Sequence, residues 1–207
     1  MSVETAKREY VKKARAEQEE ATRERITEAA VKLHGSIGPA RTTVSGVAEE
    51  AGVQRATVYR HFPDEASLFD ACSAHYWASH PLPDIGSWKA IRDPGERLRR
   101  AFADFYAFYE DNEAMLERTG RDAHLVAAME APRAAFFGFL EFAAGEIVKG
   151  RPERGAARRR TVAAVGHGLS FATWQSLTRI QGLSNAEAVA VAAAMVEGAG
   201  SARPRHA

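Results

Sequence analysis

Apolar residues recur every three or four positions along most of this chain. The first clear stripe consists of Ile26, Ala29, Ala30 and Leu33, which predicts a helix that begins near Thr22. Runs in which apolar and polar residues alternate, the mark of a strand, are absent from the sequence. The pattern therefore predicts an all-α fold.

Two short helices are predicted next, with a glycine between them. Thr42 and Thr43 offer caps for the first helix, and Gly52 suits the sharp turn at its end. The second helix is predicted over residues 54–61, with Val58 on its inward side. Two short amphipathic helices that are joined by a tight turn and packed on a preceding helix form a helix-turn-helix.

Longer helices are predicted over the rest of the chain. Asp64 is expected to cap a fourth helix that runs towards Trp77, and residues 80–94, with three prolines and a glycine, are expected to form a connector. A further helix is predicted to start at Asp93 and Pro94. The remaining helices are predicted at about residues 132–149, 157–181 and 184–198.

Composition adds limits on the class of protein. The 207 residues carry a net charge of +1 and a single cysteine, Cys72, which lies on the apolar side of the fourth helix. We therefore expect an inert buried thiol rather than a nucleophile. One cysteine suits a reducing compartment, and the sequence has neither an apolar run of about 18 residues nor the apolar core of a signal peptide. These features predict a cytoplasmic protein outside the membrane.

Charge is concentrated in residues 1–21, which we assign to an N-terminal arm. Basic residues from Lys7 to Arg15 precede the acidic cluster of Glu17, Glu19 and Glu20. One interpretation is a solvated, frayed helix. The other is a flexible basic arm that contacts DNA phosphates or the minor groove.

The outward side of the second short helix, over residues 54–61, has side chains suited to nucleic acid. Arg55 is able to bind guanine through two hydrogen bonds, Gln54 is able to do the same with adenine, and Ala56 would contact a thymine methyl group. A helical hairpin used only for packing would not require polar groups on one shared side. The predicted DNA-contacting residues are Thr42, Thr43, Ser45, Gln54, Arg55, Ala56, Thr57, Tyr59, Arg60 and His61.

Residues 42–69 resemble the DNA-binding domain of the TetR/AcrR family of transcriptional regulators. The resemblance rests on Thr42-Thr43, on Ala51-Gly52-Val53 at the turn, and on the string from Thr57 to Phe62. It covers about the first third of the chain. It implies a helix-turn-helix DNA-binding domain at residues 22–69, followed by a larger helical ligand-binding and dimerisation domain at residues 70–207.

One position departs from the family pattern. Many members place a lysine just after the turn at Phe62 and Pro63, where it holds a phosphate, and this chain has Glu65 there. A carboxylate cannot make that contact. We expect Arg60 or the N-terminal arm to compensate, and we expect Glu65→Lys to tighten DNA binding.

Aromatic residues crowd the helices of the second domain. Individual rings suit a plain core, while the resemblance implies that some line an apolar effector site. For His167, which lies between two glycines, a ligand contact and a crowded helix crossing remain equal alternatives. The predicted ligand-binding residues are Phe105, Tyr109, Phe139, Phe142, His167, Phe171 and Trp174.

The resemblance also implies a homodimer formed through the last two helices, with an intramolecular helix pair as the alternative. Two-fold partners are expected to read a palindromic double-stranded DNA operator. The implied function is a repressor released by a small, largely apolar effector. An activator and an architectural DNA-binding protein without an effector remain alternatives.

An enzyme is not expected. The sequence contains no nucleophile elbow, no phosphate-binding glycine loop and no zinc-ligand spacing. His75 and His80 are five residues apart, which is poor spacing for two metal ligands on one helical face. We therefore predict no catalytic residue, no metal and no cofactor.

Overall fold

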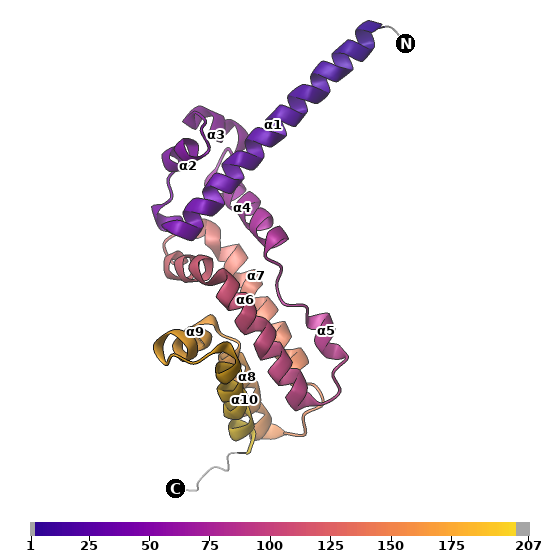
Figure 1. Cartoon of the computed structure of the whole chain (residues 1–207), viewed down its shortest axis with the longest axis vertical. Coiled ribbons are helices and arrows are strands. Elements are labelled where there is room, and N and C mark those ends of the chain that lie inside the picture. The colour runs from indigo at the N-terminus through magenta and orange to yellow at the C-terminus, as the bar shows by residue number, and fades with distance from the viewer. Residues whose placement is uncertain (1–2, 202–207) are drawn as a thin grey trace. The chain divides into compact units, whose positions relative to one another are not determined.

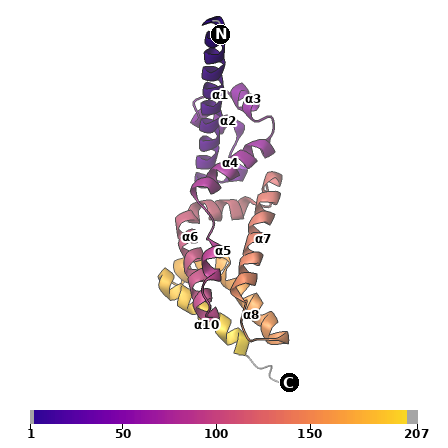
Figure 2. The same cartoon turned by 90° about the vertical axis from the view of Figure 1, so that its right-hand side faces the viewer.

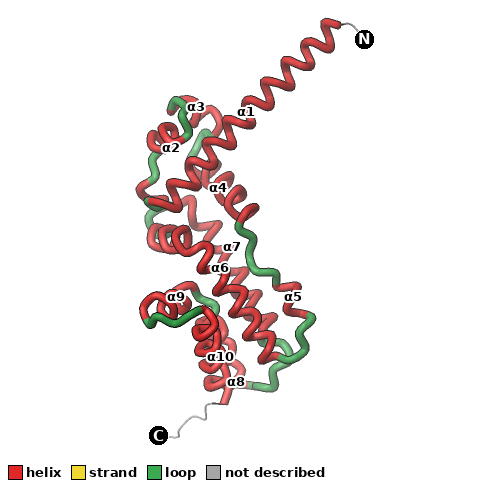
Figure 3. Tube along the Cα trace, viewed as in Figure 1, coloured by secondary structure: helices red, strands yellow, loops and turns green. Residues whose placement is uncertain are grey.

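The computed structural model describes residues 3–201, and these residues form helices joined by loops, with no strand among them (Figures 1 and 3). The predicted all-α class is confirmed. Residues 1–2 of the predicted arm and residues 202–207 lie outside the described part. For residues 3–8 only the backbone is described. No helix within residues 3–201 combines the length and the apolar character needed to cross a bilayer.

The chain divides into two compact units. The N-terminal unit takes in the residues up to His80 together with Glu117–Glu130, and the C-terminal unit takes in Pro81–Leu116 and the residues from Ala131 onward. The N-terminal unit contains α1 (Val3–Ser36), η1 (Pro39–Arg41), α2 (Val44–Glu50), α3 (Arg55–His61), α4 (Glu65–Ser79) and η2 (Ala127–Met129). The C-terminal unit contains α5 (Ile85–Lys89), all but the first residue of α7 (Glu130–Ile147), α8 (Gly155–Gly168), α9 (Phe171–Gln175), η3 (Ser176–Ile180) and α10 (Asn185–Ser201). Helix α6 (Pro94–Asp122) begins in the C-terminal unit and ends in the N-terminal unit.

The predicted start of the first helix near Thr22 is wrong, because α1 begins at Val3. The Thr22 hydroxyl donates to the Gln18 carbonyl at 2.8 Å, as a residue inside a helix does, and it caps nothing. Residues 3–21 contain no glycine or proline and are rich in alanine, glutamate, lysine and arginine, which favour helix. The helix therefore continues through the arm rather than starting after it.

The turn signals of the helix-turn-helix act as the sequence predicts. The Thr43 hydroxyl caps α2 by accepting from the Gly46 amide at 3.1 Å, and the Asp64 carboxylate caps α4 by accepting from the Ser67 amide at 2.7 Å. Gly52 has φ +63°, which a residue with a side chain rarely adopts. Val58 is buried as predicted, and it packs with Phe62 and the apolar stripe of α1.

The predicted connector at residues 80–94 is only partly irregular, because it contains α5. Asp84 caps this short helix by accepting from the Gly86 amide at 2.8 Å. Trp88 is fully buried, and its indole NH donates to the Asp104 carboxylate on α6 at 2.7 Å. The buried tryptophan therefore holds this segment against α6, although its prolines predicted an irregular connector.

The single helix predicted over residues 157–181 is also wrong. Helix α8 ends at Gly168, and the Ser170 hydroxyl caps α9 by accepting from the Thr173 amide at 3.2 Å. The Tyr106 hydroxyl donates to the Gly168 carbonyl at 3.0 Å, and the Tyr109 hydroxyl donates to the Leu169 carbonyl. Two buried tyrosines thus satisfy carbonyl groups at the end of α8, and the break is stable.

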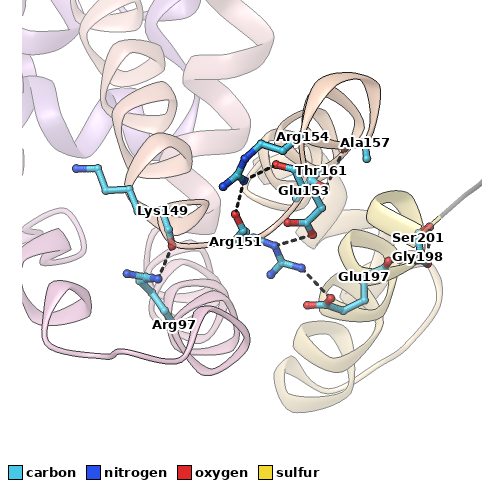
Figure 4. Close-up of polar contacts among 10 residues, drawn as sticks. All are labelled: Arg97, Lys149, Arg151, Glu153, Arg154, Ala157, Thr161, Glu197, Gly198 and Ser201. Atoms are coloured by element: carbon cyan, nitrogen blue, oxygen red, sulfur yellow. Dashed lines mark hydrogen bonds and ion pairs between the residues drawn. The ribbon is translucent and has the colours of Figure 1, made fainter.

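Helix α8 packs along α10 within the chain. Figure 4 shows the polar contacts at one end of this pair, where the buried Arg151 guanidinium lies 3.2 Å from the Glu153 carboxylate and 2.7 Å from the Glu197 carboxylate on α10. Nearby, Arg97 donates to the Lys149 carbonyl at 2.6 Å and joins the start of α6 to the end of α7 (Figure 4). These contacts hold the loop before α8 in place.

Candidate DNA-binding site

Helix α3 carries six of the ten residues predicted to contact DNA, and four of the six are exposed. Tyr59 is 44% exposed, while Val58 beside it is 1% exposed. The Arg55 guanidinium donates to the Tyr59 hydroxyl at 3.0 Å and lies over its ring, 5.4 Å from the centroid. Arg55 and Tyr59 therefore form one continuous polar and aromatic surface on the outside of the helix.

The structure separates the predicted residues into two groups by burial. The first group is exposed, and the second is half-buried. The exposed residues are Thr43, Ser45, Gln54, Arg55, Ala56, Tyr59 and Arg60, and the half-buried ones are Thr42, Thr57 and His61. The Thr42 hydroxyl is already bonded, because it donates to the Gly38 carbonyl at 2.9 Å. The exposed group thus presents the larger share of side chains that are available to a nucleic acid.

His61 closes α3 and lies next to two cationic groups. Burial and the neighbouring Arg60 and Arg23 guanidinium groups lower the pKa of His61. Arg23 on α1 donates to the His61 carbonyl at 2.7 Å, and its guanidinium lies 4.1 Å from the Phe62 ring centroid. Sequence reasoning missed Arg23, since nothing in the pattern of α1 marks a contact 38 residues further along the chain.

A cleft of about 320 Å³ opens beside α3 in the N-terminal unit. Val47, Phe62 and other apolar side chains line it. Thr43, Tyr59 and Glu65 also line it, so the carboxylate of Glu65 shares one cleft with two residues predicted to contact DNA. A carboxylate in this cleft disfavours an approaching phosphate.

His34 is buried at the inner wall of the cleft. Its ring stacks on the Phe69 ring at a centroid distance of 4.8 Å. Burial lowers the pKa of His34 to about 4, so the imidazole is neutral at pH 7. This buried histidine packs against α4 through the ring of Phe69.

The end of α6 is bonded to the last residue of α1 and to the loop that follows it, again inside the N-terminal unit. Arg118 donates to the Ser36 carbonyl at 2.6 Å, and Arg121 donates to the Ile37 carbonyl at 3.1 Å. The buried Asp122 carboxylate accepts from the Ala40 amide at 3.1 Å, and its hydrogen bond with Arg121 lowers its pKa. Sequence reasoning did not identify these anchors, because their partners are backbone groups about 80 residues away.

Five of the seven predicted ligand-binding residues meet in one cluster of rings in the C-terminal unit. Phe105, Tyr109 and Trp174 are fully buried, and the ring centroid of Tyr109 lies 5.5 Å from that of Phe171 and 6.0 Å from that of Trp174. Phe139 joins through Phe105 at 6.0 Å. We call these five residues the ring cluster.

The other two predicted ligand-binding residues lie outside the ring cluster. Phe142 is 55% exposed, and His167 is exposed near the end of α8.

The indole NH of Trp174 donates to the Asn185 side chain at 2.9 Å, and the Arg179 guanidinium lies over the same ring at 4.7 Å. The ring cluster is therefore apolar with a few polar groups at its margin.

Cys72 is buried, and burial raises the pKa of its thiol to about 12, in agreement with the expected inert role. Among the residues that the structure describes, no group of three or more histidine, cysteine or carboxylate side chains is placed to hold a metal ion.

The N-terminal unit is similar to known bacterial regulators. Residues 26–72 match the family described as bacterial regulatory proteins, tetR family. The chain is 38% identical over 88 residues to the HTH-type transcriptional regulator SrpR of Pseudomonas putida, in a match that covers 39% of this chain and 40% of SrpR. It is 36% identical over 88 residues to TtgW, another HTH-type transcriptional regulator of Pseudomonas putida, in a match that covers 39% of this chain and 63% of TtgW. Each match thus spans less than two thirds of the relative.

Solved structures share the fold over most of the chain. A TetR-like transcriptional regulator from Rhodococcus sp. RHA1 superposes with a TM-score of 0.60 at 17% identity, covering 86% of this chain and 94% of the other. The regulator FadR from Bacillus subtilis, in complex with stearoyl-CoA, superposes with a TM-score of 0.58 at 16% identity, covering 86% and 97%. The predicted arrangement of a helix-turn-helix followed by a larger helical part is confirmed.

Proposed function

We propose that this chain is a transcriptional regulator of the TetR family that represses transcription as a homodimer on a palindromic operator. A small, largely apolar effector releases it. The observation that carries the proposal is the exposed side of α3, where Arg55 and Tyr59 form a surface above the buried Val58. A short helix with this division presents its polar side to the major groove.

Roles within the DNA-binding site follow from chemistry and position. Arg55 and Gln54 stand at the first turn of α3, where base edges are reached, and Arg55 is suited to guanine. Thr43 and Ser45, at the start of α2, are suited to phosphates, which set register without reading sequence. We assign DNA binding to residues 22–69, and effector binding and dimerisation to residues 70–207.

Dimerisation through α8 and α10 is supported by what their packing leaves uncovered. Val162 on α8 and Val191 and Met195 on α10 are 39%, 39% and 46% exposed. Small alanine residues surround them on α10, which allows close approach of another helix. A second copy of the same pair would cover these side chains in a four-helix interface.

Effector binding is proposed at the ring cluster, with the apolar rings as the body of the site and Asn185 and Arg179 at its margin. Helix α6 offers the route to DNA. It carries Phe105 and Tyr109 in the cluster, and its last turns bind the loop after α1 through Arg118 and Arg121. The effector must bind the DNA-incompetent state more tightly, since equal affinity for both states shifts nothing.

The test begins with selection of bound duplexes from a random DNA library, which yields the operator and its symmetry together. Replacing Arg55, Thr57 and Tyr59 by alanine should remove preference for the selected operator and leave the unfolding transition unchanged, because these side chains are exposed or half-buried. Arg99→Ala, at an exposed position of α6, is the control and should bind as the wild type does. Undiminished operator binding by the triple variant contradicts the proposal.

A further inference from the structure

The first half of α1 is a helix that stands clear of the body of the N-terminal unit. Every side chain from Glu9 to Ala21 is exposed, and Thr22 is the first buried residue. Residues 3–21 extend about 28 Å at 1.5 Å per residue. Figures 1 and 2 show this part of α1 running well past α2 and α3. The sequence was compatible with a solvated, frayed helix or a flexible arm, and the structure has a solvated, regular helix.

The extension leaves the body of the N-terminal unit beside α3. Arg23, one residue after Thr22, donates to the carbonyl of His61, which is the last residue of α3, and its guanidinium covers the Phe62 ring. These contacts fix the base of the extension relative to α3. A nucleic acid that binds α3 therefore lies close to the base of the extension, next to Arg23.

Charge distribution shows why the extension matters. Residues 42–69 contain two arginines against four carboxylates, so the helix-turn-helix segment is itself acidic. Neutralisation of phosphates supplies most of the non-specific affinity of a DNA-binding protein. Residues 7–15 contain five lysines and arginines against one glutamate. The strongest basic cluster near α3 is thus on the extension.

Weak ion pairs hold two of these basic groups in the absence of DNA. The Lys13 ammonium lies 4.0 Å from the Glu17 carboxylate, and the Arg15 guanidinium lies 3.1 Å from the Glu19 carboxylate, each one helical turn away. All four side chains are more than half exposed. Pairs this exposed contribute little, so a phosphate is able to replace either carboxylate.

We propose that residues 3–21 of α1 form a rigid helical extension that binds the phosphates of duplex DNA just outside the half-site read by α3. Lys12 and Lys13 lie about 16 Å along the helix from Arg23, close to half a turn of DNA. Charge complementarity selects DNA as the occupant. A membrane-binding helix needs an extended apolar side, and here Tyr10 and Val11 are the only large apolar side chains between Glu9 and Ala21.

The inference rests on the proposed function, and the experiment separates the two. Two duplexes are used, one limited to the selected operator and one with about 15 unrelated base pairs added on each side. Wild type and a variant with Lys12, Lys13 and Arg15 all changed to glutamine are titrated against both duplexes at several salt concentrations. A variant with Lys89, Arg92 and Arg99 changed to glutamine loses the same charge from exposed positions of the C-terminal unit and is the matched control.

On the longer duplex, the arm variant should lose about tenfold or more in affinity and show a shallower dependence on salt. On the short duplex it should bind within about twofold of wild type, and the control should match wild type on both. Equal loss on both duplexes, or no loss on either, overturns the inference while the proposed function stands. Failure of the wild type to bind either duplex overturns both.

Rigidity is tested separately with Ala16→Pro, which interrupts α1 between its basic and acidic parts. Proline removes a helical hydrogen bond and displaces the preceding turn, so the basic residues lose their fixed position relative to α3. The affinity of Ala16→Pro for the longer duplex should then fall towards that of the variant in which Lys12, Lys13 and Arg15 are glutamine. Ala16→Ser preserves the helix and serves as control. If Ala16→Pro retains full affinity, a flexible arm suffices and the rigid extension is wrong.

Discussion

Two tyrosines show how differently the two units use the same side chain. Tyr59 on α3 is 44% exposed, and its hydroxyl accepts from Arg55 at the surface. Tyr109 on α6 is fully buried, its hydroxyl donates to the Leu169 carbonyl, and burial raises its pKa. The tyrosine of the N-terminal unit thus lies on the surface of a helix whose other side is buried. The tyrosine of the C-terminal unit is part of the core itself.

The difference has consequences for mutation. Substitutions on the outside of α3 should change DNA binding with little effect on folding, since surface changes rarely alter stability by much. Substitutions in the ring cluster should change folding first, and any effector site there is inseparable from the core. The following variants test that contrast.

The largest effect is expected for Trp174→Ala. Trp174 is fully buried, touches the rings of Tyr109 and Phe171, and bonds Asn185 through its indole NH. Removing a buried ring of this size costs about 3–5 kcal/mol. Urea unfolding followed by circular dichroism measures the loss. Arg60→Ala, at an exposed position of α3, is the control and should change the unfolding free energy by less than about 0.5 kcal/mol.

Two glycines that flank His167 provide a matched pair inside one helix. A Cβ added at Gly168 would lie 2.5 Å from the Phe102 ring, whereas one added at Gly166 meets nothing within 4 Å. Gly168→Ala should therefore destabilise the C-terminal unit by about 1–3 kcal/mol through overpacking. Gly166→Ala should stabilise it by about 0.5–1 kcal/mol, because alanine favours helix. Equal melting temperatures for the two variants would show that this crossing is not tightly packed.

Sequence reasoning located the helix-turn-helix well because its signals are local. Thr43, Gly52 and Asp64 each act on backbone groups within a few residues, so their effect is visible in the sequence. The division of α3 into a buried and an exposed side follows from helical periodicity alone. Most of the predicted DNA-contacting residues are consequently exposed where they were expected.

The wrong predictions concern helix ends that depend on residues far away in the sequence or on residues that resemble helix caps. The break after Gly168 depends on hydroxyl groups of Tyr106 and Tyr109, about 60 residues earlier in the chain. The start of α1 was misplaced because threonine is a common cap, yet Thr22 lies inside a helix. Which aromatic residues share a cluster also depends on packing between helices, and the sequence could not separate Phe142 from Phe139.

A pH-dependent contribution to the stability of the N-terminal unit is expected from His34. Its folded pKa of about 4 lies below its ordinary value of 6.5, so the unfolded state takes up the proton first. The stabilisation is present above about pH 6.5 and is lost as pH falls towards 4, by about 2 kcal/mol between pH 7 and pH 5. His34→Leu should lose about this much less than wild type over that range, measured by urea unfolding. A variant of the exposed His124, His124→Gln, should retain the wild-type dependence.

The smallest expected effect concerns Glu65, a carboxylate beside residues that are proposed to contact DNA phosphates. Glu65 shares a cleft with Thr43 and Tyr59, so a phosphate held by those hydroxyl groups meets a carboxylate. Glu65→Gln should tighten operator binding by a few fold, and Glu65→Lys should tighten it further and steepen the dependence of affinity on salt. Titration of each variant at several salt concentrations measures both quantities.

Glu49→Gln is the matched control for Glu65→Gln, because it removes one exposed carboxylate from α2 that does not line the cleft. If both variants tighten binding equally, the gain reflects net charge alone. If Glu65→Lys binds no more tightly than wild type at any salt concentration, no phosphate enters the cleft. In that case the phosphate contacts of this protein lie elsewhere, and the basic extension of α1 is the next site to test for them.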